Sequence, residues 1–245
     1  MKKVFLPVIL VILVFSSTGI HAEEKKEEKR WKDEAELSFV STNGNSETTT
    51  LSAKNLLFYK FSDKLNGEWK ITALKSEDDS ETTAERYSTG LKLSYLFTQR
   101  IYGAVAGGWL QDEFAGFDAR YYIGPLIGYK FLAGPKHFLT GEAGANYARE
   151  EYTDDNDKDF LEGRAFGRYE YVFTKKTKFS QSMEYLYDFD DTDNYKVNSE
   201  TALITALAGN FALKTSYEVR YQNRPIPEDL DETDTILTVA LVVNF

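Results

Sequence analysis

The chain has 245 residues, a formal net charge of −10, no cysteine, and an aromatic content of 15% that comes mostly from tyrosine and phenylalanine. The absence of cysteine excludes a small disulfide-linked fold, a thiolate metal site and a cysteine nucleophile. The acidic balance argues against a nucleic-acid partner. Abundant aromatic residues in a chain of polar average composition are the feature to explain.

The N-terminus has the layout of a secretory signal peptide. A basic tip precedes an apolar run that ends at Phe15, and a short polar tail ends at Ala22. The apolar run is shorter than the roughly 20 residues that a membrane-spanning helix needs. Cleavage after Ala22 would remove two lysines and change the net charge from −10 to −12. We predict a signal peptide over 1–22, a charged N-terminal tether over 23–30, and a single domain over 31–245.

From Trp31 onward the sequence alternates with a period of two, which is typical of β-strands. Long acidic connections alternate with short ones, so the strands are expected to run up and down between two different environments. The first hairpin is an exception, because Asn43-Gly44 predicts a tight turn. About twelve strands are expected, with approximate spans 31–41, 46–61, 65–76, 84–97, 101–111, 119–131, 138–150, 160–173, 177–188, 194–207, 211–222 and 233–245.

The length of these segments distinguishes a membrane barrel from a soluble sandwich. Strands of soluble sheets usually have about 5 to 6 residues, whereas a tilted membrane-spanning strand needs about 9 to 11. A sheet in lipid must close on itself, because every backbone polar group needs a partner. We predict an all-β fold, a closed antiparallel transmembrane β-barrel of about 12 strands, in the outer membrane of a Gram-negative bacterium.

Two aromatic features support this prediction. A tyrosine, a spacer and a phenylalanine recur at the ends of alternate segments, and we expect an interfacial aromatic belt beside the short turns, formed by Tyr59, Phe61, Tyr95, Phe97, Tyr129, Phe131, Tyr171 and Phe173. A second belt near the long connections would include Tyr187 and Tyr221. The C-terminal stripe of Leu241, Val243 and Phe245 resembles the signal by which the barrel-assembly machinery recognises bacterial outer-membrane barrels.

Two longer stretches carry a family resemblance. WKDEAELSFVSTNGNSETTTLSAKNLLFYK and YGAVAGGWLQDEFAGFDARYYIGPLIGYKF resemble the start and the middle of a bacterial family of salt-induced outer-membrane proteins, the YdiY-like group. The resemblance covers nearly the whole chain after residue 22. It implies an outer-membrane β-barrel and, through the family name, expression linked to salt. It does not imply a molecular activity.

The sequence offers little for catalysis or metal binding. After residue 22 the only histidine is His137, in a short turn expected on the periplasmic side, so a serine hydrolase is disfavoured. An EF-hand beginning at Asp155 fails, because Phe160 and Phe166 stand where Gly and Glu are needed. We predict no enzyme activity, no cofactor and no metal site. The long acidic loops could still share divalent cations with lipopolysaccharide, a second expected partner beside membrane lipid.

Charged residues on the polar faces are predicted to line the lumen: Glu142, Glu162, Arg164, Arg168, Glu170, Glu184, Glu218 and Arg220. Adjacent opposite charges, as in Glu162/Arg164 and Arg168/Glu170, suggest that many of them pair. Two functions follow: a structural, envelope-integrity barrel with a closed lumen, or a narrow passive channel for ions and small polar solutes, linked to salt or osmotic stress. The alternative is a surface binding or adhesion protein that acts through its long acidic extracellular loops.

Overall fold

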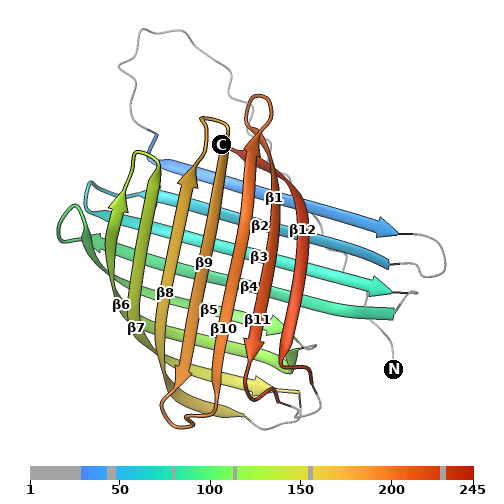
Figure 1. Ribbon diagram of the computed structural model, residues 1–245. Helices are drawn as coiled ribbons and strands as arrows, with labels where there is room; N and C mark the ends of the chain where they lie inside the picture. Colours follow the sequence, from blue (N-terminus) through green and yellow to red (C-terminus); the bar gives the residue numbers. More distant parts are fainter. Residues whose placement is uncertain (1–28, 43–47, 79–80, 113–114, 154–156, 227–229) are drawn as a thin grey trace, which may run out of the picture.

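The computed structural model describes residues 29–42, 48–78, 81–112, 115–153, 157–226 and 230–245 (Figure 1). These residues form twelve strands, which confirms the predicted number: β1 (Trp31–Thr42), β2 (Thr48–Lys60), β3 (Leu65–Asp78), β4 (Glu81–Leu96), β5 (Ile101–Asp112), β6 (Phe117–Ala133), β7 (His137–Tyr152), β8 (Lys158–Val172), β9 (Thr177–Asp188), β10 (Tyr195–Ala206), β11 (Phe211–Gln222) and β12 (Thr233–Asn244). Within the described ranges there is no helix long and apolar enough to cross a membrane.

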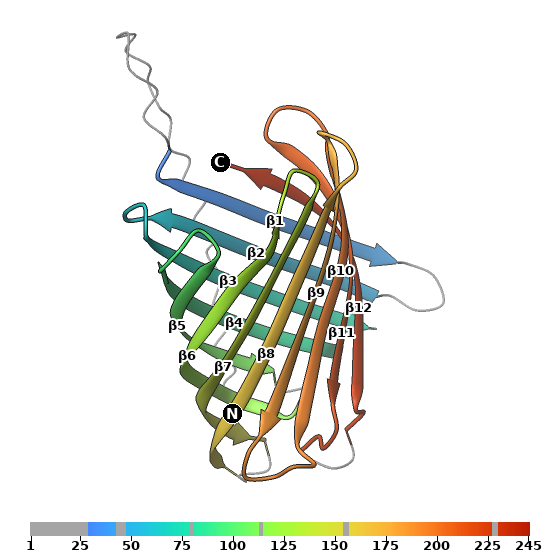
Figure 2. The ribbon, with the colours of Figure 1, turned by 60° about the vertical axis from the view of Figure 1, so that its left-hand side comes forward.

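The strands form one closed antiparallel barrel, as predicted. Each strand pairs with its neighbours in the sequence, and β1 pairs with β12 to close the sheet. In Figures 1 and 2 the strands of one wall, β8 to β12, cross the strands of the opposite wall, β1 to β4, steeply. Such a crossing is expected when every strand is tilted by about 35–45° to the barrel axis.

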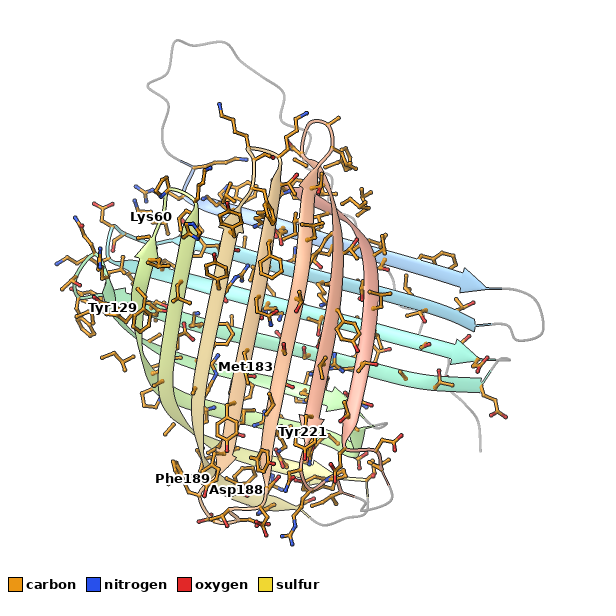
Figure 3. The ribbon with its side chains drawn as sticks, in the orientation of Figure 1. Lys60, Tyr129, Met183, Asp188, Phe189 and Tyr221 are labelled. Carbon is orange, nitrogen blue, oxygen red and sulfur yellow. The ribbon has the colours of Figure 1, made fainter. Side chains whose placement is uncertain are left out.

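The outer face of the barrel is apolar. Leu237 is 69% exposed, and Met183, in the middle of the outer face of β9 in Figure 3, is 54% exposed. Charged side chains such as Glu162 and Lys214 are buried inside instead. A water-soluble protein shows the opposite distribution, so the alternation seen in the sequence places its apolar residues outward.

The two ends of the barrel differ in their connections. Figure 3 places Lys60 and Tyr129, beside short turns, at one end, and Asp188, Phe189 and Tyr221, beside longer connections, at the other. The predicted Asn43-Gly44 turn lies outside the described residues. The register pairs Thr42 with Thr48, so five residues connect β1 to β2.

Hydroxyl side chains shape three of the short turns in the same way. Ser62 Oγ accepts hydrogen bonds from the backbone N–H groups of residues 64 and 65, at 3.3 and 3.0 Å. Thr98 and Thr174 do the same for the second and third residues after them. In the first turn the Lys60 ammonium lies 2.9 Å from Asp63, and this contact holds the pKa of Asp63 below its usual value. These contacts explain why Ser or Thr follows the aromatic pair.

The seam between β1 and β12 is much shorter than the other strand pairings. Only residues 34–37 of β1 pair with residues 241–244 of β12, whereas β1 pairs with β2 over its whole length. Beyond the seam the two strands diverge toward the end with the long connections (Figure 2). On the inner side, Lys214 Nζ of β11 lies 2.8 Å from Glu36 Oε1 of β1, so an ion pair bridges the seam.

Candidate functional site in the barrel interior

The four predicted aromatic pairs share one geometry on the outer face. Their rings meet edge to face, with centroids 4.8 Å apart in Tyr59–Phe61, 5.6 Å in Tyr95–Phe97, 4.9 Å in Tyr129–Phe131 and 4.8 Å in Tyr171–Phe173. All four lie beside short turns, at the same end of the barrel. Edge-to-face contact is the preferred arrangement of aromatic rings. The structure therefore brings together the residues predicted to form a belt.

A glycine lies beneath three of the phenylalanine rings. A Cβ atom added at Gly67, Gly103 or Gly141 would lie 2.9 Å from the ring of Phe61, Phe97 or Phe131, respectively. The ring therefore covers a backbone that has no side chain of its own. The spacing of six residues between Phe61 and Gly67, and between Phe97 and Gly103, is the sequence signal for this packing.

His137 packs against the aromatic belt beside the short turns and does not line the lumenal cavity. It is the first residue of β7, its Nδ1 lies 2.8 Å from the Tyr169 hydroxyl oxygen, and its ring centroid lies 4.7 Å from that of Tyr171. At the opposite end, Tyr195 lies between Tyr185 and Tyr221, with ring centroids 5.9 Å from each. Aromatic residues thus gather at both ends of the outer face.

The C-terminal stripe also lies on the outer face. Leu241 and Phe245 are exposed, and Val243 pairs with Ala35 of β1 and with Phe211 of β11. The three residues therefore form part of the seam that closes the barrel.

The interior encloses a cavity of about 610 Å³ to which every strand contributes. Seven of the eight predicted lumenal residues line it: Glu142, Glu162, Arg164, Arg168, Glu184, Glu218 and Arg220. Glu170 is not among the lining residues. It pairs with Arg168 at 2.8 Å and approaches Lys178 at 3.8 Å near the end with the short turns.

One network of charges crosses the lumen between distant strands. Lys54 of β2 lies 3.5 Å from Glu200 of β10 and 3.5 Å from Glu218 of β11. Lys214 lies 3.0 Å from Glu200 and also reaches Glu36. Since β2 and β10 are separated by three strands in the sheet order, these contacts span the interior rather than follow the wall.

The same network narrows the end with the long connections. Arg220 of β11 approaches Asp112 of β5 to 3.7 Å, although five strands separate β5 from β11 in either direction around the barrel. Asp112 also pairs with Arg86 at 3.1 Å and is almost fully buried. Gly116, with φ 84°, packs against the backbone of Ile226, so the β5–β6 and β11–β12 connections meet over this constriction.

A second network lies nearer the short turns. Glu142 accepts hydrogen bonds from Lys92 at 3.0 Å, Arg164 at 3.0 Å and Tyr102 at 2.6 Å. Arg164 also donates to Glu184 at 2.7 Å. The buried carboxylate of Glu142 thus accepts three hydrogen bonds, which is the condition for burying its charge.

A third cluster fills one wall near the long connections. Glu150 is fully buried and accepts hydrogen bonds from Arg120 at 2.7 Å, from Lys196 and from Tyr152. Arg120 also donates to Glu162. The Lys196 ammonium lies 5.2 Å from the centre of the Phe117 ring, within the range of a cation–π contact.

The sequence predicted the charged lumen but not all of its pairs. Arg168 does pair with Glu170, whereas Glu162 and Arg164 turn to Arg120 and to Glu142 instead of to each other. The prediction also missed Glu36, Arg86, Asp112, Glu150 and Lys196. All but Asp112 lie within predicted strands and, like the predicted lumenal residues, have even numbers. Listing every charged residue at an even position of each predicted strand would therefore have found them.

The described residues contain no group of three or more His, Cys, Asp or Glu side chains arranged to hold a metal ion. The acidic stretch considered for calcium falls partly on 154–156, outside the described residues. Its end does contribute to a surface cluster, in which Arg149 contacts Glu151, Asp157 and Asp159 at 2.9, 3.3 and 3.6 Å.

Comparison with known proteins identifies the family. A family model described as "Protein of unknown function, DUF481" matches residues 35–245. The chain belongs to the DUF481 family. The chain is also 26% identical over 213 residues to an uncharacterized protein, YdiY, of Escherichia coli K12, and the match covers 87% of this chain and 82% of the relative. The resemblance to the YdiY-like group is therefore confirmed.

Solved structures support the same fold for this DUF481 member. The translocator domain of the autotransporter NalP from Neisseria meningitidis aligns with a TM-score of 0.51 at 11% identity, over 90% of this chain and 89% of that chain. An outer membrane channel from Pseudomonas putida F1 aligns with a TM-score of 0.53 at 11% identity, over 88% and 94%. At these identities the likeness concerns the fold alone.

Proposed function

We propose that the protein is a non-enzymatic outer-membrane β-barrel that conducts small ions through a narrow, constricted lumen. The observation that carries this proposal is the contact of 3.7 Å between Arg220 and Asp112, which joins opposite walls. Acidic and basic side chains line a cavity of about 610 Å³, and Arg220 and Asp112 are among the lining residues. A polar cavity favours passage of ions, and the constriction excludes larger solutes.

The same proposal includes how the protein is exported and assembled and what the barrel contacts in the membrane. The signal peptide 1–22 would direct export, and the mature chain would begin at Glu23. The barrel-assembly machinery would recognise the stripe that ends at Phe245. The apolar outer face would contact membrane lipid, and the acidic connections would face lipopolysaccharide. An increase in expression with salt, which the family name implies, is part of this proposal.

Single-channel recording in planar bilayers tests the function. We expect small conductance steps from the wild-type protein and larger steps from Arg220→Gln, because this change removes the contact with Asp112 across the mouth. Arg149→Gln is the matched control, since it removes the same charge near the same end but from the outer face. If neither the wild type nor Arg220→Gln conducts, the closed structural barrel is the better description. If Arg220→Gln and Arg149→Gln give conductance steps of the same size, the contact between Arg220 and Asp112 is not the constriction.

A further inference from the structure

Lys70 differs from the other lumenal cations. It lies on the inner face of β3, lines the cavity and has an exposed side chain. No acidic group of the described residues lies within the 4.0 Å that defines an ion pair with Lys70. Lys214 and Lys196, by contrast, are buried and pair with acids. The Lys70 ammonium is therefore available to a solute in the cavity.

The network around Lys70 is otherwise balanced in charge. Four acids meet four bases in ion pairs: Glu36, Asp112, Glu200 and Glu218 with Lys54, Arg86, Lys214 and Arg220. Lys70 interacts electrostatically with members of this network and adds one positive charge to it. Glu68, two residues before Lys70 on the same face of β3, also lines the cavity, and its carboxylate lies 3.9 Å from the Lys92 ammonium. Within this network of the described residues, Lys70 is thus the cation that no ion pair matches.

The wall beside Lys70 carries small side chains. Lys70 pairs across the sheet with Gly90, and Thr72, Ser88 and Ala106 line the cavity nearby. Cross-strand neighbours lie about 4.5–5.5 Å apart, and the absence of a side chain at Gly90 lets the Tyr122 hydroxyl approach its backbone beside the lysine.

Tyr122 supplies a second donor to the same space. Its ring lies against Gly108, where an added Cβ would come within 2.8 Å of two ring carbons. Its hydroxyl oxygen lies 3.4 Å from the position of a Cβ on Gly90. The Tyr122 hydroxyl therefore lies beside the cross-strand partner of Lys70, and it makes no hydrogen bond with another described residue.

We propose that Lys70 and Tyr122 form a binding site for a small anion, such as chloride or phosphate, and that this site favours anions in the lumen. The ammonium supplies the charge and the hydroxyl supplies a directed hydrogen bond, a combination that holds an anion better than either group alone. The effect on permeation rests on the proposed function, whereas binding itself does not.

Reversal potentials in a KCl gradient test the effect on permeation. We expect Lys70→Gln to lower the ratio of chloride to potassium permeability about threefold or more, and Tyr122→Phe to lower it by less. Lys75→Gln is the matched control on the same strand, because Lys75 lies on the outer face and pairs with Glu77 at 2.6 Å. An unchanged ratio in a conducting Lys70→Gln variant would overturn the effect of Lys70 on ion selectivity.

A measurement of binding separates this proposal from the proposed function. NMR spectra of lysine side chains in detergent micelles, titrated with inorganic phosphate at constant ionic strength, should show a saturable shift for Lys70 and none for Lys75. Tyr122→Phe should weaken that shift. A silent bilayer with a saturable Lys70 shift would refute conduction alone. A conducting bilayer without the shift and without a change of selectivity in Lys70→Gln would refute the anion site alone.

Discussion

Replacing Glu150 by glutamine should destabilise the barrel strongly. Glu150 is fully buried, and its carboxylate accepts hydrogen bonds from Arg120, Lys196 and Tyr152. The variant keeps the size of the side chain, but it leaves Lys196 buried without an acid. Removal of one partner from a buried ion pair costs about 3–5 kcal/mol. We expect the free energy of unfolding to fall by about that amount.

The adjacent residue provides a matched control. Glu151 lies on the outer face of the same strand and pairs with Arg149 at 2.9 Å, where both side chains are partly exposed. Exposed pairs contribute about 0–1 kcal/mol, so Glu151→Gln should change the free energy of unfolding little. Urea unfolding in detergent or lipid discs, followed by tryptophan fluorescence, measures both variants.

A second substitution tests the cause of the loss. Lys196→Met in the Glu150→Gln background removes the unpaired lysine, while Arg120 keeps its contact with Glu162. Apolar replacement of a buried ion pair often recovers about 1–4 kcal/mol, and we expect a recovery of that order. If Glu150→Gln costs no more than Glu151→Gln, or if Lys196→Met adds to the loss, the cluster does not stabilise the barrel in this way.

Three further predictions concern the turns, the seam and the chain end. Thr98→Ala should lower the free energy of unfolding by about 0.5–2 kcal/mol, because two backbone N–H groups lose their acceptor, whereas Gln99→Ala should not change it. Lys214→Met should lower the temperature at which the folded form is lost on an SDS gel, since Glu36 would remain unpaired at the seam; no drop relative to Lys75→Met would contradict this. Deletion of Phe245 should reduce the folded protein in outer-membrane fractions, and an unchanged amount would argue against the assembly signal.

The aromatic belt and the strand number could be read from the sequence because both are local patterns. A period of two assigns each residue of a strand to one face, whatever the partner strand is. The pairs Tyr59–Phe61 and Tyr95–Phe97 lie on one face for that reason alone. The exclusion of a soluble sandwich followed from strand length, which is also a local property.

The fine structure of the turns was only partly visible in the sequence. The sequence predicted short connections after the aromatic pairs, but the double role of Ser62, Thr98 and Thr174 as hydrogen-bond acceptors depends on the path of the backbone. The packing of Phe61 on Gly67 likewise needs the register of β2 against β3. A shift of the register by one residue would place these groups on opposite faces.

The sequence by itself determined which side chains face the lumen, and only the tertiary structure decided which of them meet. Asp112 and Arg220 come together because the sheet closes and its mouth narrows, a relation that no periodicity within a strand contains. The same closure leaves Lys70 without an ion-pair partner among the described residues and confines the β1–β12 seam to four residue pairs. Alternation is set by the geometry of a single strand, whereas contacts across a barrel depend on the register and tilt of all its strands together.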